Sequence, residues 1–195
     1  MVGDHSTSER VYRQLKIEIL DGVYNLERLN ISLLADRYRS SATPVREALL
    51  RLVGESIVSM PQTGGFEVPR LDRKGLTDLY DLGLGLMLMV SDRLSTPSPV
   101  LAHHLRDSRL GWPVDAVFEH LADATDNAGL GAAVRANNVS LHRIRRIEER
   151  RLPGLEREFG LLVSAVNSED PAALRRVLSR YFRRRLARID DILEI

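Results

Sequence analysis

The sequence predicts a mostly α-helical protein, in which three helices and a β-hairpin come before an all-α antiparallel helical bundle. Apolar residues recur at helical spacing along most of the 195 residues. Two short runs, IVSM and FEV, have the composition of strands, and the turn PQTGG between them contains glycine. The helical pattern resumes after Pro69 and continues to the end. We therefore expect two domains, residues 1–70 and residues 71–195.

The charge balance and the absence of certain residues limit the classes of function. The 28 Lys and Arg residues nearly balance the 27 Asp and Glu residues, so any affinity for DNA must come from a local basic patch. The chain has no cysteine, which excludes disulfides, thiolate metal sites and cysteine nucleophiles. Neither a Gly-rich phosphate loop nor a nucleophile elbow is present. We expect no catalytic residues and no enzyme.

The distribution of apolar residues predicts a cytoplasmic protein. Polar residues follow Met1, where a signal peptide would have an apolar core. The most apolar run, residues 82–90, is about half the length of the roughly 20 residues that span a bilayer. We therefore expect no membrane partner.

The first three helices are predicted from terminal signals and apolar spacing. Ser6 and Glu9 have the spacing of a capping box, and a helical apolar pattern then runs to Gly22. A second helix is expected over residues 31–38. Its apolar residues are Leu33, Leu34 and Tyr38. A third helix is expected to begin at Thr43 as N-cap, with Pro44 in the first helical position. Its apolar side comprises Val45, Ala48, Leu49, Leu52 and Val53.

Residues 41–52 have the properties of the second helix of a helix-turn-helix, which lies in the major groove of DNA. Free backbone N–H groups in its first turn suit phosphate oxygens. Arg46 lies opposite the apolar side, where a guanidinium can bind guanine or a phosphate. The full set of expected DNA contacts is Arg37, Arg39, Ser41, Thr43, Arg46, Gln62 and Gly65. The alternative is that Arg46 and Arg51 only solvate one face of the helix.

Four segments of the first domain resemble the GntR family of bacterial transcription regulators. They are VYRQLKIEILDG (11–22), LLADRY (33–38), SATPVREALLRL (41–52) and IVSMPQTGGFEV (57–68). The rest of the chain is similar to the helical effector domain of the FadR-like, or FCD, subfamily. The resemblance implies a winged helix-turn-helix and a homodimer on a palindromic site in double-stranded DNA. It also implies that the protein is a repressor whose DNA binding is controlled by a small-molecule effector.

The sequence departs from this family where the family contacts DNA. Ala42 stands in place of an Arg that reads DNA, and Ile31 and Ser32 replace an acidic-then-basic pair. Arg39 and Ser56 occupy positions that are usually Gly. One lost bidentate Arg removes about 1–3 kcal/mol of base discrimination. We expect an altered operator or compensation by Arg39. The alternative is a ligand-sensing or dimerising protein with a degenerate DNA-binding domain.

The resemblance also implies a metal site in the helical domain, made by an Asp and three His residues. These positions fall at Asp115, Glu119, Phe159 and Tyr181 in this sequence, so the imidazoles are lost. We therefore expect neither a metal nor another cofactor. The same four residues are the predicted lining of a small apolar effector pocket, if a pocket is present. Asp115 and Glu119 are more simply explained as solvated or as paired with Arg.

Further helices are predicted over residues 71–94, 100–106, 113–125, 128–150, 153–167 and 171–193. Gly83 and Gly85 interrupt the first of these helices, and each costs roughly 1 kcal/mol relative to Ala. They indicate either tight helix packing or open space for a ligand. The last helix has many Arg residues on its polar side. It is either a nucleic-acid patch or, more simply, a solvated face with ion pairs.

Overall fold

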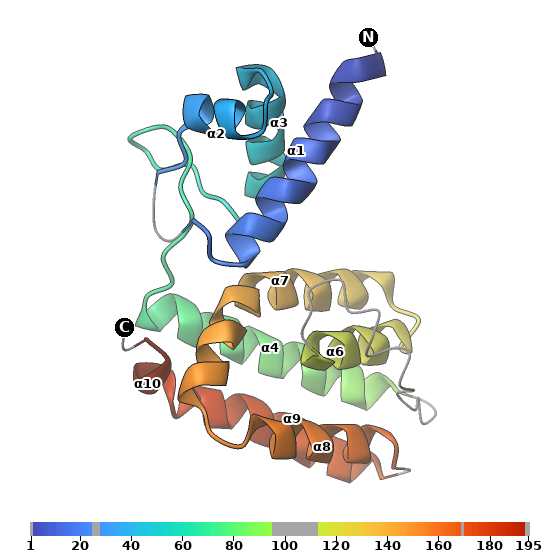
Figure 1. Cartoon of the computed structure of the whole chain (residues 1–195). Coiled ribbons are helices and arrows are strands. Elements are labelled where there is room, and N and C mark those ends of the chain that lie inside the picture. Colours follow the sequence, from blue (N-terminus) through green and yellow to red (C-terminus); the bar gives the residue numbers. More distant parts are fainter. Residues whose placement is uncertain (1, 25–27, 95–112, 169, 194–195) are drawn as a thin grey trace. The chain divides into compact units, whose positions relative to one another are not determined.

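The computed structural model describes residues 2–24, 28–94, 113–168 and 170–193. The chain divides into two compact units, Met1–Arg70 and Leu71–Ile195 (Figure 1). All regular elements of the described residues are α-helices, and the prediction of a mostly α-helical protein is confirmed. The predicted helix at 100–106 lies outside the described residues. No helix in the described part of the chain has the length and apolar character needed to cross a membrane.

In the first unit, α1 (Val2–Leu20) packs against α3 (Ala42–Gly54), and α3 packs against α2 (Ile31–Arg37). The expected start of α1 at Ser6 is wrong, because the backbone is already helical from Val2. The expected stop at Gly22 is confirmed. Gly22 has φ 76°, and the N–H of Val23 donates to the carbonyl of Glu18 at 2.9 Å, which closes a Schellman motif.

The helix α2 begins at Asn30, whose Oδ1 accepts hydrogen bonds from the N–H groups of Ser32 and Leu33. Leu34 and Tyr38 are buried as expected, but Leu33 is 67% exposed. The expectation for Leu33 was wrong because a seven-residue helix has only one buried side, and Leu34 and Ala35 define it.

The helix α3 has Ser41 as its N-cap, two residues earlier than expected, so Pro44 is the third helical residue and not the first. Proline fits there because its missing N–H has no partner within a helix's first turn. The apolar side is confirmed: Val45, Ala48, Leu49 and Leu52 are fully buried. Val53 is only partly buried.

The expected β-hairpin is reduced to isolated antiparallel bridges, and the described residues form no regular strand. Ser59 and Glu67 exchange both backbone hydrogen bonds, at 2.8 and 3.0 Å, and Arg28 bridges to Glu67 from the other side. The chain turns between them through Gly64 and Gly65, with φ 79° and 86°.

The second unit is a helical bundle. Its described helices are α4 (Arg73–Arg93), α6 (Pro113–Asp123), α7 (Ala128–Arg151), α8 (Leu155–Val166), α9 (Pro171–Leu186) and α10 (Ile189–Leu193). The long α4 contacts α6, α7, α9 and α10, so it forms the centre of the unit (Figure 1). Short connections join α6 to α7 and α8 to α9, and each pair packs together as antiparallel neighbours.

The predicted last helix is in fact two helices, with a break at Ala187 and Arg188. The break allows Ile189 and Ile192 to be buried while α10 packs against both α4 and α7. The prediction of one helix over residues 171–193 was wrong. A single straight helix cannot pack along α4 and also turn toward α7.

Gly83 and Gly85, which both lie in α4, have opposite environments. A Cβ on Gly83 would lie 2.5 Å from Cε1 of Phe182, so this glycine permits tight packing of α4 on α9. A Cβ on Gly85 would have no atom within 4 Å, and Gly85 is exposed. Tight packing therefore explains Gly83, whereas nothing in the structure explains Gly85.

Candidate functional site

The first half of α3 presents an exposed stripe on the side opposite its buried residues. Thr43, Arg46, Glu47 and Leu50 follow one another at positions i, i+3, i+4 and i+7 and are all exposed. Nothing in the described residues pairs with the guanidinium of Arg46. Leu50 is 48% exposed on this stripe. The stripe thus offers a cation, an anion and an apolar side chain to a partner.

Ser41 leaves the first turn of α3 open. It adopts the extended N-cap conformation, but its hydroxyl makes no capping hydrogen bond to the helix. The first N–H groups of a helix have no partner within the helix, so those of α3 remain available to an acceptor such as a phosphate. Ala42 is exposed at this end and offers no donor from its side chain.

Arg39 stands in a strained conformation at the turn between α2 and α3. Its φ is 47°, and the N–H of Ser40 donates to the carbonyl of Ala35 at 2.9 Å, as in a Schellman motif. Glycine is the usual residue there, and an L-residue costs roughly 1–2 kcal/mol in the left-handed region. A strained residue retained at a turn suggests a functional role for its side chain, which is exposed.

Arg37 makes contacts within the protein that the sequence did not predict. Its Nη2 lies 3.0 Å from Oε2 of Glu18, and its guanidinium lies 5.7 Å from the ring centre of Tyr24. The hydroxyl of Tyr38 donates to the same Glu18 oxygen at 2.9 Å. Burial, followed by the hydrogen bonds of Tyr24 and Glu18, raises the pKa of Tyr38, so its hydroxyl stays a donor.

A second arginine, Arg10, joins this edge from α1. Its Nη2 donates to the carbonyl of Tyr38 at 2.9 Å, and Arg10, Arg37 and Arg39 line one shallow hollow on the surface. Sequence reasoning missed Arg10 because its partner is a backbone atom on another helix. Leu50 and Glu47 were also missed, although their spacing from Thr43 and Arg46 was visible.

The turn at residues 61–65 is anchored at its side and exposed at its tip. The N–H of Gly64 donates to the carbonyl of Pro61 at 2.8 Å, and Nη2 of Arg28 donates to Oγ1 of Thr63 at 2.7 Å. Gln62 and Gly65 are exposed at this tip. A fixed turn with an exposed tip can meet a DNA backbone without a loss of conformational entropy.

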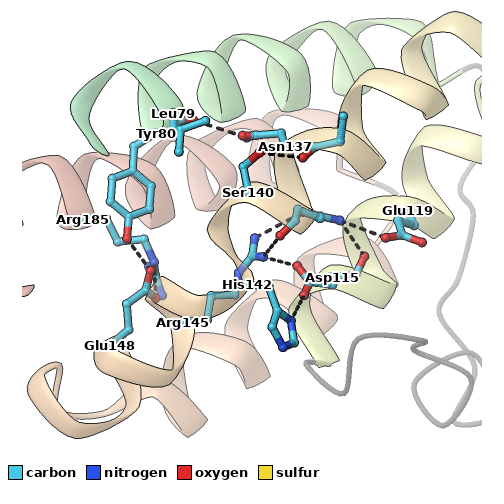
Figure 2. A network of polar contacts seen from close by, with 12 residues as sticks. Leu79, Tyr80, Asp115, Glu119, Asn137, Ser140, His142, Arg145, Glu148 and Arg185 are labelled. Carbon is cyan, nitrogen blue, oxygen red and sulfur yellow. Dashed lines mark hydrogen bonds and ion pairs between the residues drawn. The ribbon is translucent and has the colours of Figure 1, made fainter. Parts of the chain in front are cut away.

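The second unit contains a buried polar network around Asp115 (Figure 2). Asp115 forms an ion pair with Arg145, and the two side chains are 2% and 3% exposed. Arg145 also donates to Oδ1 and to the backbone carbonyl of Asn138, at 3.2 and 3.3 Å. Nδ1 of His142 lies 4.0 Å from the carboxylate of Asp115 and has no hydrogen-bond partner in the described residues.

A second buried network surrounds Glu148 (Figure 2). Its Oε1 accepts from the hydroxyl of Tyr80 at 2.5 Å, and its Oε2 accepts from Nε of Arg185 at 2.8 Å. Arg185 also pairs with Glu158 at 2.9 Å and lies 3.4 Å from the ring centre of Tyr181. Burial, then the charge of Glu148, raises the pKa of Tyr80, so this hydroxyl remains protonated and donates.

The four predicted pocket residues lie around this region, but other side chains lie between them. Asp115 is paired with Arg145, and the ring centre of Tyr181 lies 3.4 Å from the guanidinium of Arg185. Asn138 donates to Oε1 of Glu119 at 3.3 Å. Burial raises the pKa of Glu119, although that hydrogen bond opposes the shift. Phe159 is partly buried on α8 against the core.

The residues at the four family metal positions do not fit a metal ion. Phe159 has no donor atom, the Asp115 carboxylate is paired with a cation, and Tyr181 is a poor substitute for an imidazole. Within the described ranges, no three His, Cys, Asp or Glu side chains gather closely enough to hold an ion.

The Arg-rich side of α9 makes mostly ion pairs, as the simpler interpretation of the sequence proposed. Arg175 pairs with Asp92, Arg176 with Asp170 at 3.3 Å, and Arg184 with Glu158 at 3.3 Å. Arg185, from the same run, is buried. Arg180 and Arg183 are exposed and have no ion pair among the described residues, so part of the basic side stays open.

Comparison with known proteins identifies the first unit. Residues 7–68 match the family described as "Bacterial regulatory proteins, gntR family". A stretch of 85 residues, 43% of this chain, is 35% identical to the HTH-type transcriptional repressor GlaR of Escherichia coli (strain K12). The match spans only 39% of that relative.

Solved structures extend the likeness in fold to the whole chain. A transcriptional regulator GntR from Rhodococcus sp. RHA1 has a TM-score of 0.78 at 18% identity and covers 94% of this chain and 97% of its own. The McbR/YncC protein of E. coli has a TM-score of 0.63 at 22% identity, with 93% and 95% covered. At these identities the solved structures show a likeness in fold alone. By sequence, residues 7–68 of the chain match the GntR family of bacterial regulatory proteins.

Proposed function

We propose that this chain is a metabolite-responsive repressor, acting in the cytoplasm, that places α3 in the major groove of a palindromic operator. The observation that carries the proposal is the exposed stripe on α3. Arg46 stands on it with no partner among the described residues, directly opposite a side that is fully buried. A rigid helix that holds a single unpaired guanidinium away from its core is suited to base or phosphate contact.

The proposed DNA contacts are Arg39, Ser41, Thr43, Arg46, Gln62 and Gly65, with Arg37 in a weaker role. Arg37 already pairs with Glu18, so its charge is partly neutralised. Arg10 is added because it lies beside Arg39 in the same hollow. Ala42 removes one base contact, whereas exposed Leu50 can contact a thymine methyl group. These differences favour an operator unlike the family's usual one.

The dimer and the effector belong to the same proposal. A palindrome is read by a two-fold symmetric dimer, because each half-site takes one recognition helix. Repression is inferred from the relative GlaR, which is named a transcriptional repressor. The second unit is proposed to receive a small molecule, since buried polar atoms such as Oδ1 of Asn137 and Nδ1 of His142 have no hydrogen-bond partner in the described part.

Replacing Arg46 by Ala is expected to weaken operator binding by about 1–3 kcal/mol, which is roughly 5- to 150-fold in Kd. The measurement is fluorescence anisotropy with the region upstream of the protein's own gene, at several salt concentrations. A contact to a base would relax the sequence preference, whereas a contact to a phosphate would reduce the salt slope by about 1.

Arg51→Ala is the matched control on the same helix. It removes the same charge, but Arg51 pairs with Glu9 at 2.7 Å and lies 3.7 Å from the ring centre of Tyr12, facing α1. We expect a change in Kd of less than about threefold, since no direct contact is lost. If Arg46→Ala behaves like this control, α3 does not read DNA through Arg46.

Replacing Arg39 by Gly is expected to change stability and DNA affinity in opposite directions. Glycine relieves the strain of the left-handed conformation, which raises the free energy of unfolding by up to about 1 kcal/mol. The loss of the guanidinium should weaken operator binding. Urea unfolding and anisotropy test the two effects. Arg39→Lys is the control, since it keeps both the charge and the strain. Unchanged affinity for Arg39→Gly would remove Arg39 from the interface.

The alternative is a dimerising or ligand-sensing protein whose DNA-binding unit is degenerate. It is favoured by Ala42 and by the balance of nine basic and nine acidic residues within residues 1–70. Salt-independent or absent binding to every upstream fragment tested would support this alternative over the repressor.

A further inference from the structure

We propose that Arg145 is a built-in cation of the helical unit, whose guanidinium joins α6 and α7 without a metal ion. The proposal does not depend on DNA binding, and its tests do not involve DNA. It concerns the position where the family resemblance implies a metal and where the residues of this chain do not fit one.

The guanidinium of Arg145 is surrounded by oxygen atoms from both helices. Asp115 supplies a carboxylate from α6, and Asn138 supplies its amide and backbone oxygens from α7 at 3.2 and 3.3 Å. A carboxylate and two amide-type oxygens form an acceptor set for a cation, and the five donors of a guanidinium can satisfy several of them at once.

This cation is permanent because the surrounding charges outweigh its burial. Burial alone would lower the pKa of Arg145, but Asp115, and then Tyr181 and Glu148, raise it above its ordinary value. Arg145 is 2% exposed, and Asp115 is 1% exposed. The pair therefore exchanges with solvent only when the helices separate. A bound metal ion, by contrast, can be removed by a chelator.

A divalent ion has no place beside this arginine. The Asp115 carboxylate is the nearest anionic ligand, and the guanidinium already neutralises it. An added cation would have to displace Arg145 into the apolar core, where an unpaired charge is very unfavourable. Glu148, a second buried carboxylate, lies on α7 and is likewise paired with an arginine, Arg185.

The first test uses the unmodified full chain and metals. Thermal unfolding is followed after dialysis against EDTA, and again after addition of Zn²⁺, Ni²⁺ or Mn²⁺. We expect Tm to change by less than about 1 °C in each case, because the described residues gather no set of ligands for an ion. Elemental analysis of protein purified without chelator should find less than about 0.1 metal ion per chain. One tightly held ion per chain, or a large rise in Tm with one of these metals, would overturn the proposal.

The second test is a double-mutant cycle on the pair. Arg145→Met and Asp115→Leu should each lower Tm by about 10 °C or more, because each leaves one buried charge without its partner. The double variant should have a higher Tm than either single variant, since it leaves no unpaired charge.

An exposed ion pair between the same two helices provides the matched control. Arg135 pairs with Asp123 at 2.8 Å, and the side chains are 45% and 63% exposed. Arg135→Met and Asp123→Leu should each change Tm by less than about 3 °C, with no coupling. If the Arg145 and Asp115 effects simply add, as in the control, Arg145 is not the cation that joins these helices. Should a single variant fail to fold, the metal test on the unmodified chain still decides.

Discussion

Replacing Glu148 by Ala is expected to lower the free energy of unfolding of the helical unit by about 3–5 kcal/mol. Glu148 is 2% exposed and is the partner of both Tyr80 and Arg185. Without it, the Tyr80 hydroxyl has lost its acceptor. Arg185 keeps Glu158, the carbonyl of Tyr181 and the Tyr181 ring as partners, and its own side chain is 3% exposed. A buried charge that loses its main counter-charge is among the most unfavourable changes to a core.

The measurement is urea unfolding followed by circular dichroism. Glu149→Ala is the matched control, because Glu149 is the next residue of α7 and is exposed. Its effect should stay within about 0.5 kcal/mol. Glu148→Gln should fall between the two, since its amide oxygen still accepts from Tyr80 but carries no charge. Equal stability of the Glu148→Ala and Glu149→Ala variants would show that the buried network contributes little.

Replacing Gly83 by Ala is expected to destabilise the helical unit by about 1–3 kcal/mol, although alanine is the better helix former. The added methyl group would lie 2.5 Å from Cε1 of Phe182. Phe182 cannot move aside easily, because its ring packs against Phe118 and Tyr181 with ring centres 5.6 and 5.0 Å away. The strain should therefore exceed the gain in helix propensity.

Gly85→Ala is the control two residues away on the same helix. No atom lies within 4 Å of the added methyl group, so only the helix propensity changes. We expect stabilisation by up to about 1 kcal/mol. Opposite signs for the two variants in one unfolding experiment would confirm that α4 meets α9 at Gly83. Stabilisation by both substitutions would contradict this packing.

Much of the first unit was predictable because its signals are local. The buried side of α3 follows from apolar residues at helical spacing, and the end of α1 follows from Gly22. The exposure of Arg46 then follows from its place opposite Val45 and Leu49. The bounds were less predictable, as the start of α1 at Val2 and the cap of α3 at Ser41 show. Helix ends depend on small differences between competing backbone hydrogen bonds.

Which arginines are paired, buried or strained was not predictable, because many arginines stand in similar sequence surroundings. Arg37 and Arg39 are two residues apart, yet one is paired with Glu18 and the other stands strained at a turn. The Arg run of α9 was expected on the polar side, but Arg185 is buried because Glu148, 37 residues away, accepts from it. Helical spacing assigns a side to each residue and says nothing about a partner on another helix.

The sequence by itself determined the mostly helical fold, the third helix with its exposed Arg46, and the absence of histidine at Glu119, Phe159 and Tyr181. Periodicity, turn residues and residue identity are properties of short segments, so they can be read without a structure. Only the tertiary structure decided that Arg145 pairs with Asp115 and that Gly83, not Gly85, is packed tightly. These outcomes depend on which helices meet and at what distance, because the cost of a buried charge or an added methyl group is set by its neighbours in space.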